Sequence, residues 1–214
     1  MAADSRTWSE FADALAFLGN SLLAPMNQTE RHGINPEFWD AFPDFEDDHV
    51  ADAVHGCQAF ALARCAQMSE DDLVRELSVE YTRLFVGPPR PAAAPWETFY
   101  RNEGVTVGFG EATFEMQRLL RDAGLQVSNE NNQYADHIGI ELLLASVLCA
   151  RLAELDDAAA QEEARNGLAS YLDAHPLAWI GALHDQVAHE APEGYLDHVL
   201  LLAQAVVTAL RSKL

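Results

Sequence analysis

Apolar side chains recur at intervals of three and four residues along almost the whole chain, and this spacing limits the fold to packed α-helices. The first run ends at Pro25 and places Phe11, Leu15, Leu18 and Leu22 on one helical face. No stretch alternates apolar and polar residues long enough to indicate a strand, and no Asn-Gly or Asp-Gly pair lies between two such stretches. We therefore expect an all-α protein.

Helix-capping and helix-breaking residues divide the chain into about nine helices in a single domain spanning residues 1–214. Asn35-Pro36 and Ser69 are typical of helix starts, whereas Gly87-Pro88 is typical of a helix end. The expected helices cover residues 7–24, 36–42, 46–67, 69–86, 111–124, 134–155, 156–171, 175–190 and 192–214. A polar linker is expected over residues 128–133.

A long loop rich in proline and glycine, from Gly87 to Gly110, interrupts the helical pattern. It contains four prolines, four glycines and the aromatic residues Trp96, Phe99 and Tyr100. A loop of this length in a compact domain is usually functional or disordered, and aromatic residues argue against disorder. Two alternatives remain open at this point: the aromatic rings fill the core, or they form a binding platform.

Three ionisable residues, Asp136, His137 and Glu141, open the strongly apolar helix expected over residues 134–155. His137 and Glu141 are four apart and share a face, while Asp136 is placed to cap the helix. One alternative is a metal-dependent hydrolase using His137 and Glu141, but a catalytic metal normally needs three protein ligands. Because no nucleophile, phosphate-loop or dinucleotide motif is present, we expect no catalytic residue, metal or cofactor.

Four motifs follow one another in a recognisable order. They are Y-x-x-L-F-x-G-P at residues 81–88, P-W-E-T-F-Y at 95–100, D-H-I-G-x-E at 136–141 and H-x-x-x-W at 175–179. This order resembles the TorD/DmsD-like family of redox-enzyme maturation chaperones, which are related to NarJ. The chain departs from the family pattern at Gln133 and Tyr134, where the family has Glu and Pro. That substitution removes one acidic group from the groove in which the family receives a substrate-protein peptide.

The resemblance implies a cytoplasmic chaperone, not an enzyme, for the assembly of a molybdenum-containing oxidoreductase. It would bind the precursor of the catalytic subunit through its twin-arginine signal peptide and hold the apoenzyme until the molybdopterin cofactor is inserted before export. A NarJ-like assembly factor for a non-exported subunit is the alternative within the family. Glu97 is expected on the loop, where its carboxylate would meet a guanidinium of the peptide. The expected peptide-binding residues are Tyr81, Leu84, Phe85, Trp96, Glu97, Tyr100, Asp136, His137 and Glu141.

The charge of the chain restricts its partners. Thirteen Lys and Arg against 34 Asp and Glu give a net charge of −21, which excludes nucleic acid and favours a cationic partner. The three cysteines, Cys57, Cys65 and Cys149, suit a reducing compartment. Acidic residues precede the apolar run at residues 14–18, and no run is long enough to cross a membrane, so we expect neither a signal peptide nor membrane insertion. A monomer and a helix-swapped dimer both remain open.

Overall fold

The computed structural model describes residues 5–101, 108–126 and 133–214, and it confirms the all-α prediction for this part of the chain. Within these described ranges, the one strand-like feature is an isolated bridge between Trp96 and His137. None of the described helices has the length and apolarity needed to cross a membrane. The helices are α1 (Ser5–Leu23), α2 (Pro36–Asp40), α3 (Asp48–Cys65), α4 (Glu70–Tyr81), α5 (Thr98–Arg101), α6 (Glu111–Asp122), α7 (Ile138–Ala153), α8 (Ala158–Ala174), α9 (Pro176–Glu190) and α10 (Tyr195–Lys213).

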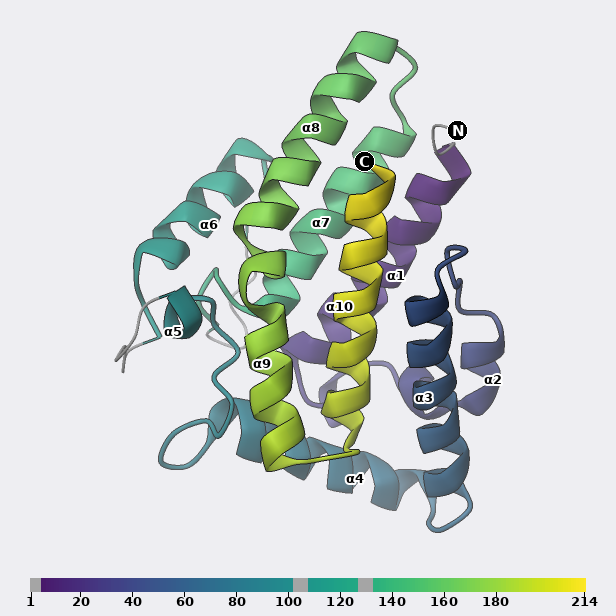
Figure 1. Ribbon diagram of the computed structural model, residues 1–214. Helices are drawn as coiled ribbons and strands as arrows, with labels where there is room; N and C mark the ends of the chain where they lie inside the picture. The colour runs from purple at the N-terminus through teal and green to yellow at the C-terminus, as the bar shows by residue number, and fades with distance from the viewer. Residues whose placement is uncertain (1–4, 102–107, 127–132) are drawn as a thin grey trace.

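Helix α7 lies at the centre of the bundle (Figure 1). It packs most extensively against α1 and also contacts α8 and α9, while α10 packs against α1, α3 and α9. Helix α4 runs across the foot of the bundle, and α5 and α6 lie on the side away from α2 and α3 (Figure 1). This arrangement explains why α7 is apolar on nearly all sides, with ten buried residues in its sixteen.

The crossing of α1 and α7 depends on two glycines. A Cβ atom on Gly139 would lie 2.7 Å from the carbonyl oxygen of Gly19, and one on Gly19 would lie 2.9 Å from the carbonyl oxygen of Gly139. Neither helix can therefore carry a side chain at this contact. Midway along the same pair, the Ser146 hydroxyl donates to the carbonyl oxygen of Ala12 at 2.7 Å. The two helices are thus held at backbone-to-backbone distance.

The expected helix boundaries are largely confirmed by their caps. The side chain of Asn35 accepts a hydrogen bond from the amide of Glu37, and that of Ser69 accepts one from Asp72. Helix α4 continues as a π-helical turn, Thr82–Val86, and stops at Gly87, whose φ of +96° strongly disfavours a side chain. The long loop then contains the short helix α5, which the sequence analysis missed. Most of the linker expected over residues 128–133 lies outside the described residues.

Candidate functional site

The second and third sequence motifs lie side by side in the structure. The amide of Glu97 donates to the carbonyl oxygen of Asp136 at 2.9 Å, and the amide of Ile138 donates to that of Pro95 at 3.0 Å. These two bonds flank the bridge between Trp96 and His137. The loop residues 95–100 and the start of α7 therefore form one unit, although about forty residues separate them.

Asp136 is fully buried and ties three elements together. Its Oδ2 accepts hydrogen bonds from the amide and the hydroxyl of Thr98, at 3.0 and 2.6 Å, and its Oδ1 accepts one from the hydroxyl of Thr113 at 2.9 Å. The prediction that Asp136 caps the central helix is wrong, because these donors on α5 and α6 turn its carboxylate away from α7. The cap is His137, whose Nδ1 accepts from the amide of Gly139 at 3.0 Å.

The buried ring of His137 is neutral. Burial lowers the pKa of His137 to about 3, and because Nδ1 is an acceptor, the ring proton resides on Nε2. That Nε2 has no hydrogen-bond partner among the described residues, and neither has the indole Nε1 of Trp96. The two rings are neighbours, with centroids 6.2 Å apart. Two buried N–H donors without acceptors are therefore present where the motifs meet.

Glu97 lies on the loop as expected, but its carboxylate is not free to meet a guanidinium of a peptide. It directly precedes α5, is fully buried, and already has a guanidinium partner within the chain. Arg101 Nε donates to Glu97 Oε1 at 2.6 Å, and His175 Nδ1 lies 2.9 Å from Glu97 Oε2. Burial alone would raise the pKa of Glu97, but the bonds from His175 and Arg101 outweigh it and lower this pKa overall. Arg101 also donates to Glu115 at 2.5 Å.

Glu141 is buried in the first turn of α7 with only one of its oxygens satisfied. Its Oε2 accepts a hydrogen bond from Trp179 Nε1 at 3.0 Å, whereas Oε1 has no partner among the described residues. Burial, reinforced by the charge of Glu97, raises the pKa of Glu141 well above its ordinary value. One potential ligand atom each of Glu97, Glu141 and His175 lie within 4.8 Å of one another, and His137 is not part of this group.

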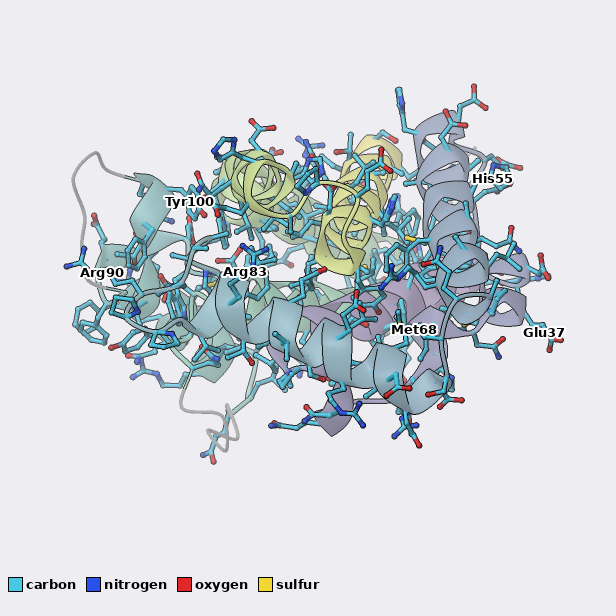
Figure 2. All side chains as sticks on the ribbon, turned by 90° about the horizontal axis from the view of Figure 1, so that it is seen from below. Glu37, His55, Met68, Arg83, Arg90 and Tyr100 are labelled. Atoms are coloured by element: carbon cyan, nitrogen blue, oxygen red, sulfur yellow. The ribbon has the colours of Figure 1, made fainter. Side chains whose placement is uncertain are left out.

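A surface groove of about 450 Å³ adjoins this buried network. Figure 2 shows two of its residues, Arg90 and Tyr100, at the end of the molecule opposite Glu37 and His55. The lining includes Trp96 and Tyr100, two of the residues predicted to bind a peptide, and their role in binding stays a prediction. The full lining is Pro89, Arg90, Pro91, Ala92, Ala94, Trp96, Phe99, Tyr100, Gly108, Tyr134 and Gln186.

A row of aromatic rings extends from this groove across the surface. Trp96 contacts Phe99 and Tyr134, Tyr134 contacts Phe109, and Phe109 contacts Phe114, with centroid separations of 4.9–6.0 Å. Phe109, Phe114 and Tyr134 are 45%, 54% and 41% exposed, which is unusual for large apolar side chains so close together. None of these three exposed aromatic residues was among the binding residues predicted from the sequence. The sequence did indicate Tyr134, which stands where the family has proline.

The other predicted site residues lie behind the groove and not in it. Tyr81, Leu84 and Phe85 are buried in the core, and the Tyr81 hydroxyl donates to the carbonyl oxygen of Leu23 at 2.8 Å. Phe85 lies next to His137, with ring centroids 6.3 Å apart. These residues fix the start of the loop, while Trp96 and Tyr100 reach the groove itself.

Comparison with known proteins supports the family resemblance that the order of the motifs indicated. The sequence model of the family described as nitrate reductase delta subunit matches residues 46–185, which is more than half of the chain. The Tat proofreading chaperone DmsD of Salmonella typhi is 33% identical over 90 residues, covering 42% of this chain and 44% of DmsD. Chaperone protein TorD of Vibrio cholerae is 23% identical over 139 residues, covering 65% of this chain and 62% of TorD. Both relatives are named as chaperones and neither as an enzyme, as the sequence analysis expected.

Proposed function

The chain belongs to the nitrate reductase delta subunit family, and from this premise we propose that it is a cytoplasmic chaperone for maturation of a molybdenum-containing oxidoreductase. Its ligand is the twin-arginine signal peptide of the catalytic-subunit precursor. By holding the precursor, it keeps the apoenzyme open until the molybdopterin cofactor is inserted and export begins. The names of the relatives, a Tat proofreading chaperone and a chaperone TorD, support this role.

The observation that carries the proposal is the exposed aromatic row beside the groove. An export signal pairs a basic stretch with an apolar one. The apolar stretch needs rings that are accessible in the free chaperone, and Tyr134, Phe109 and Phe114 are accessible. Aromatic side chains supply most of the binding energy at many protein interfaces, because each buries a large area with little loss of side-chain freedom.

The basic stretch is matched by the overall charge of the chaperone. A net charge of −21 draws a cationic peptide toward the surface before it docks. Glu97 does not grip the peptide directly in this arrangement, since Arg101 and His175 occupy its carboxylate.

A second candidate is an assembly factor for a subunit that remains in the cytoplasm. The observation in its favour is that the matching family takes its description from a nitrate reductase subunit. The two candidates share the chaperone role and differ in the client, so they predict different ligands. In the first case a twin-arginine peptide binds the chain, and in the second case it does not.

The groove is tested with the signal peptide of the molybdoenzyme precursor from the same organism, by isothermal titration calorimetry. We expect Tyr134→Ala and Phe99→Ala each to weaken binding by about tenfold or more, corresponding to roughly 1.4 kcal/mol. Leu201→Ala on α10 is the matched control, because Leu201 is a similarly exposed apolar residue (44%) that does not line the groove. Unchanged affinity in both groove variants, with wild-type circular dichroism spectra, would place the binding site elsewhere.

A further inference from the structure

We propose that Glu97, Glu141 and His175 form a binding site for a divalent transition-metal ion, for which Zn²⁺ is the best candidate. The three residues come from different parts of the fold: the residue before α5, the first turn of α7 and the junction of α8 with α9. All three are buried, at 0%, 0% and 5% exposure. One oxygen or nitrogen atom of each lies within 4.8 Å of the other two.

The unsatisfied oxygen of Glu141 is the second observation that points to a ligand. Leaving a buried carboxylate oxygen without a donor is costly, so such atoms are normally paired or bound to a metal. Among the described residues no N–H or hydroxyl group donates to Glu141 Oε1, which has only the neighbouring carboxyl group of Glu97 beside it, while its other oxygen is fixed by Trp179. A cation between Glu141 and its neighbours would satisfy this oxygen without disturbing the bond to Trp179.

The spacing and chemistry of the donors fit zinc. Zinc binds imidazole nitrogen and carboxylate oxygen at about 2.0–2.2 Å, so ligand atoms around a tetrahedral ion are roughly 3.3 Å apart. Glu97 Oε2 and His175 Nδ1 are already 2.9 Å apart, and a carboxylate oxygen of Glu141 belongs to the same group of atoms within 4.8 Å. Three protein ligands leave a fourth position for water or another donor.

The charges around the group favour a divalent ion as well. Two carboxyl groups, those of Glu97 and Glu115, bind the guanidinium of Arg101, and the carboxyl group of Glu141 lies near Glu97. A metal ion that displaces the proton of Glu141 leaves three carboxylates beside one guanidinium, and a divalent cation balances the two negative charges in excess. Arg101 binds the Oε1 atom of Glu97 and leaves Oε2 for a metal, in the way that hydrogen-bonded neighbours orient metal ligands elsewhere. Its side chain is 25% exposed and connects the buried group to the surface.

This site lies behind the peptide groove, and its metal binding is tested without a client. Full-length protein, prepared without a histidine tag and stripped with a chelator, is titrated with Zn²⁺ by calorimetry. We expect one tightly bound equivalent and a rise in melting temperature, because an ion that binds only the folded state stabilises it. Co²⁺ should give the visible absorption of a four-coordinate site.

Two variants decide the assignment. Glu141→Gln keeps the size of the side chain and an acceptor for Trp179, and His175→Gln removes the imidazole, so each should abolish stoichiometric uptake. Glu30→Gln is the control, since it alters only the exposed His32–Glu30 pair and should leave uptake unchanged. Absence of stoichiometric zinc in the wild type would overturn the proposal. So would uptake that persists in His175→Gln, which remains informative if Glu141→Gln folds poorly.

Discussion

Asp136 is the residue on which the geometry of the site depends most. Its buried carboxylate accepts three hydrogen bonds from Thr98 and Thr113. Asp136→Asn places an amide group against these donors, and we expect it to lower the free energy of unfolding by about 2–3 kcal/mol. Urea denaturation measures the change.

The comparison variant for that experiment is Asp173→Asn. The carboxylate of Asp173 accepts two hydrogen bonds from Arg211, at 2.8 Å each, and lies on the exposed surface. Its loss should therefore change the free energy of unfolding by less than about 1 kcal/mol. If the two substitutions lower the free energy of unfolding equally, the hydrogen bonds of Asp136 do not hold α5 and α6 against the start of α7.

Glu80 gives stability a dependence on pH. It is largely buried, accepts a hydrogen bond from the amide of Leu196 at 3.0 Å, and has a raised pKa, chiefly because of burial. A raised pKa means that the protonated form stabilises the fold at low pH, and that this contribution is lost as pH rises through the folded-state pKa. We therefore expect Glu80→Gln, which keeps the acceptor, to stabilise the protein by up to about 1 kcal/mol near neutral pH.

The gain from Glu80→Gln should disappear near pH 4, where the wild-type carboxyl group is protonated as well. Urea denaturation at both pH values measures it. If the stability difference between wild type and Glu80→Gln is the same at neutral pH and near pH 4, the pH dependence does not come from Glu80.

At the level of single residues, the sequence motifs predicted which segments are neighbours better than they predicted the contacts of each side chain. The motifs identified Trp96, Glu97, Asp136 and His137, and the structure brings their backbones together. The partner Arg101 was open to prediction, because it lies four residues after Glu97 on a helical face. The partners of Asp136 were not, since 38 and 23 residues separate it from Thr98 and Thr113.

Among the elements, the crossing of α1 and α7 offers the clearest test. Gly139→Ala places a methyl group 2.7 Å from the carbonyl oxygen of Gly19, so the helices must separate. We expect a loss of about 1–3 kcal/mol in the free energy of unfolding, as for other overpacked contacts. Thermal and urea denaturation measure it.

Helix α8 supplies the matched control. Gly167 lies in its middle, is exposed, and has no atom within 4 Å of an added Cβ. Gly167→Ala should therefore stabilise the protein by about 0.5–1 kcal/mol through helix propensity alone. A gain in stability from both substitutions would mean that α1 and α7 do not touch as described.

The elements were largely predictable from the sequence because helical periodicity and capping residues are local signals. The exceptions share one physical cause. Helix α5 has only four residues, and the π-helical turn after α4 has five, so neither is long enough to produce a periodic pattern. Their conformations are set by contacts with distant segments, such as the bond from Thr98 to Asp136. The prediction of one domain over residues 1–214 stays a prediction.

At the scale of the whole molecule, the net charge of −21 should govern how fast a basic peptide arrives. Exposed charges attract over about 8 Å at physiological ionic strength and about 3 Å at 1 M salt. We expect the association rate to fall steeply with added sodium chloride, and the dissociation rate to change little, because the aromatic contacts are not screened. Stopped-flow fluorescence across a salt series measures both rates, and a salt-independent association rate would contradict electrostatic steering.

The close packing of α1 on α7 also bears on how the chain can be divided. The family match begins at residue 46, so it excludes α1 entirely, together with α10. A fragment cut at the limits of that match would expose the face of α7 that α1 covers, including Gly139 and its apolar neighbours. Such a fragment would carry every recognisable motif and still have no closed core. We therefore expect the segment that identifies the family not to fold on its own, because the helix that covers one face of α7 lies outside the match.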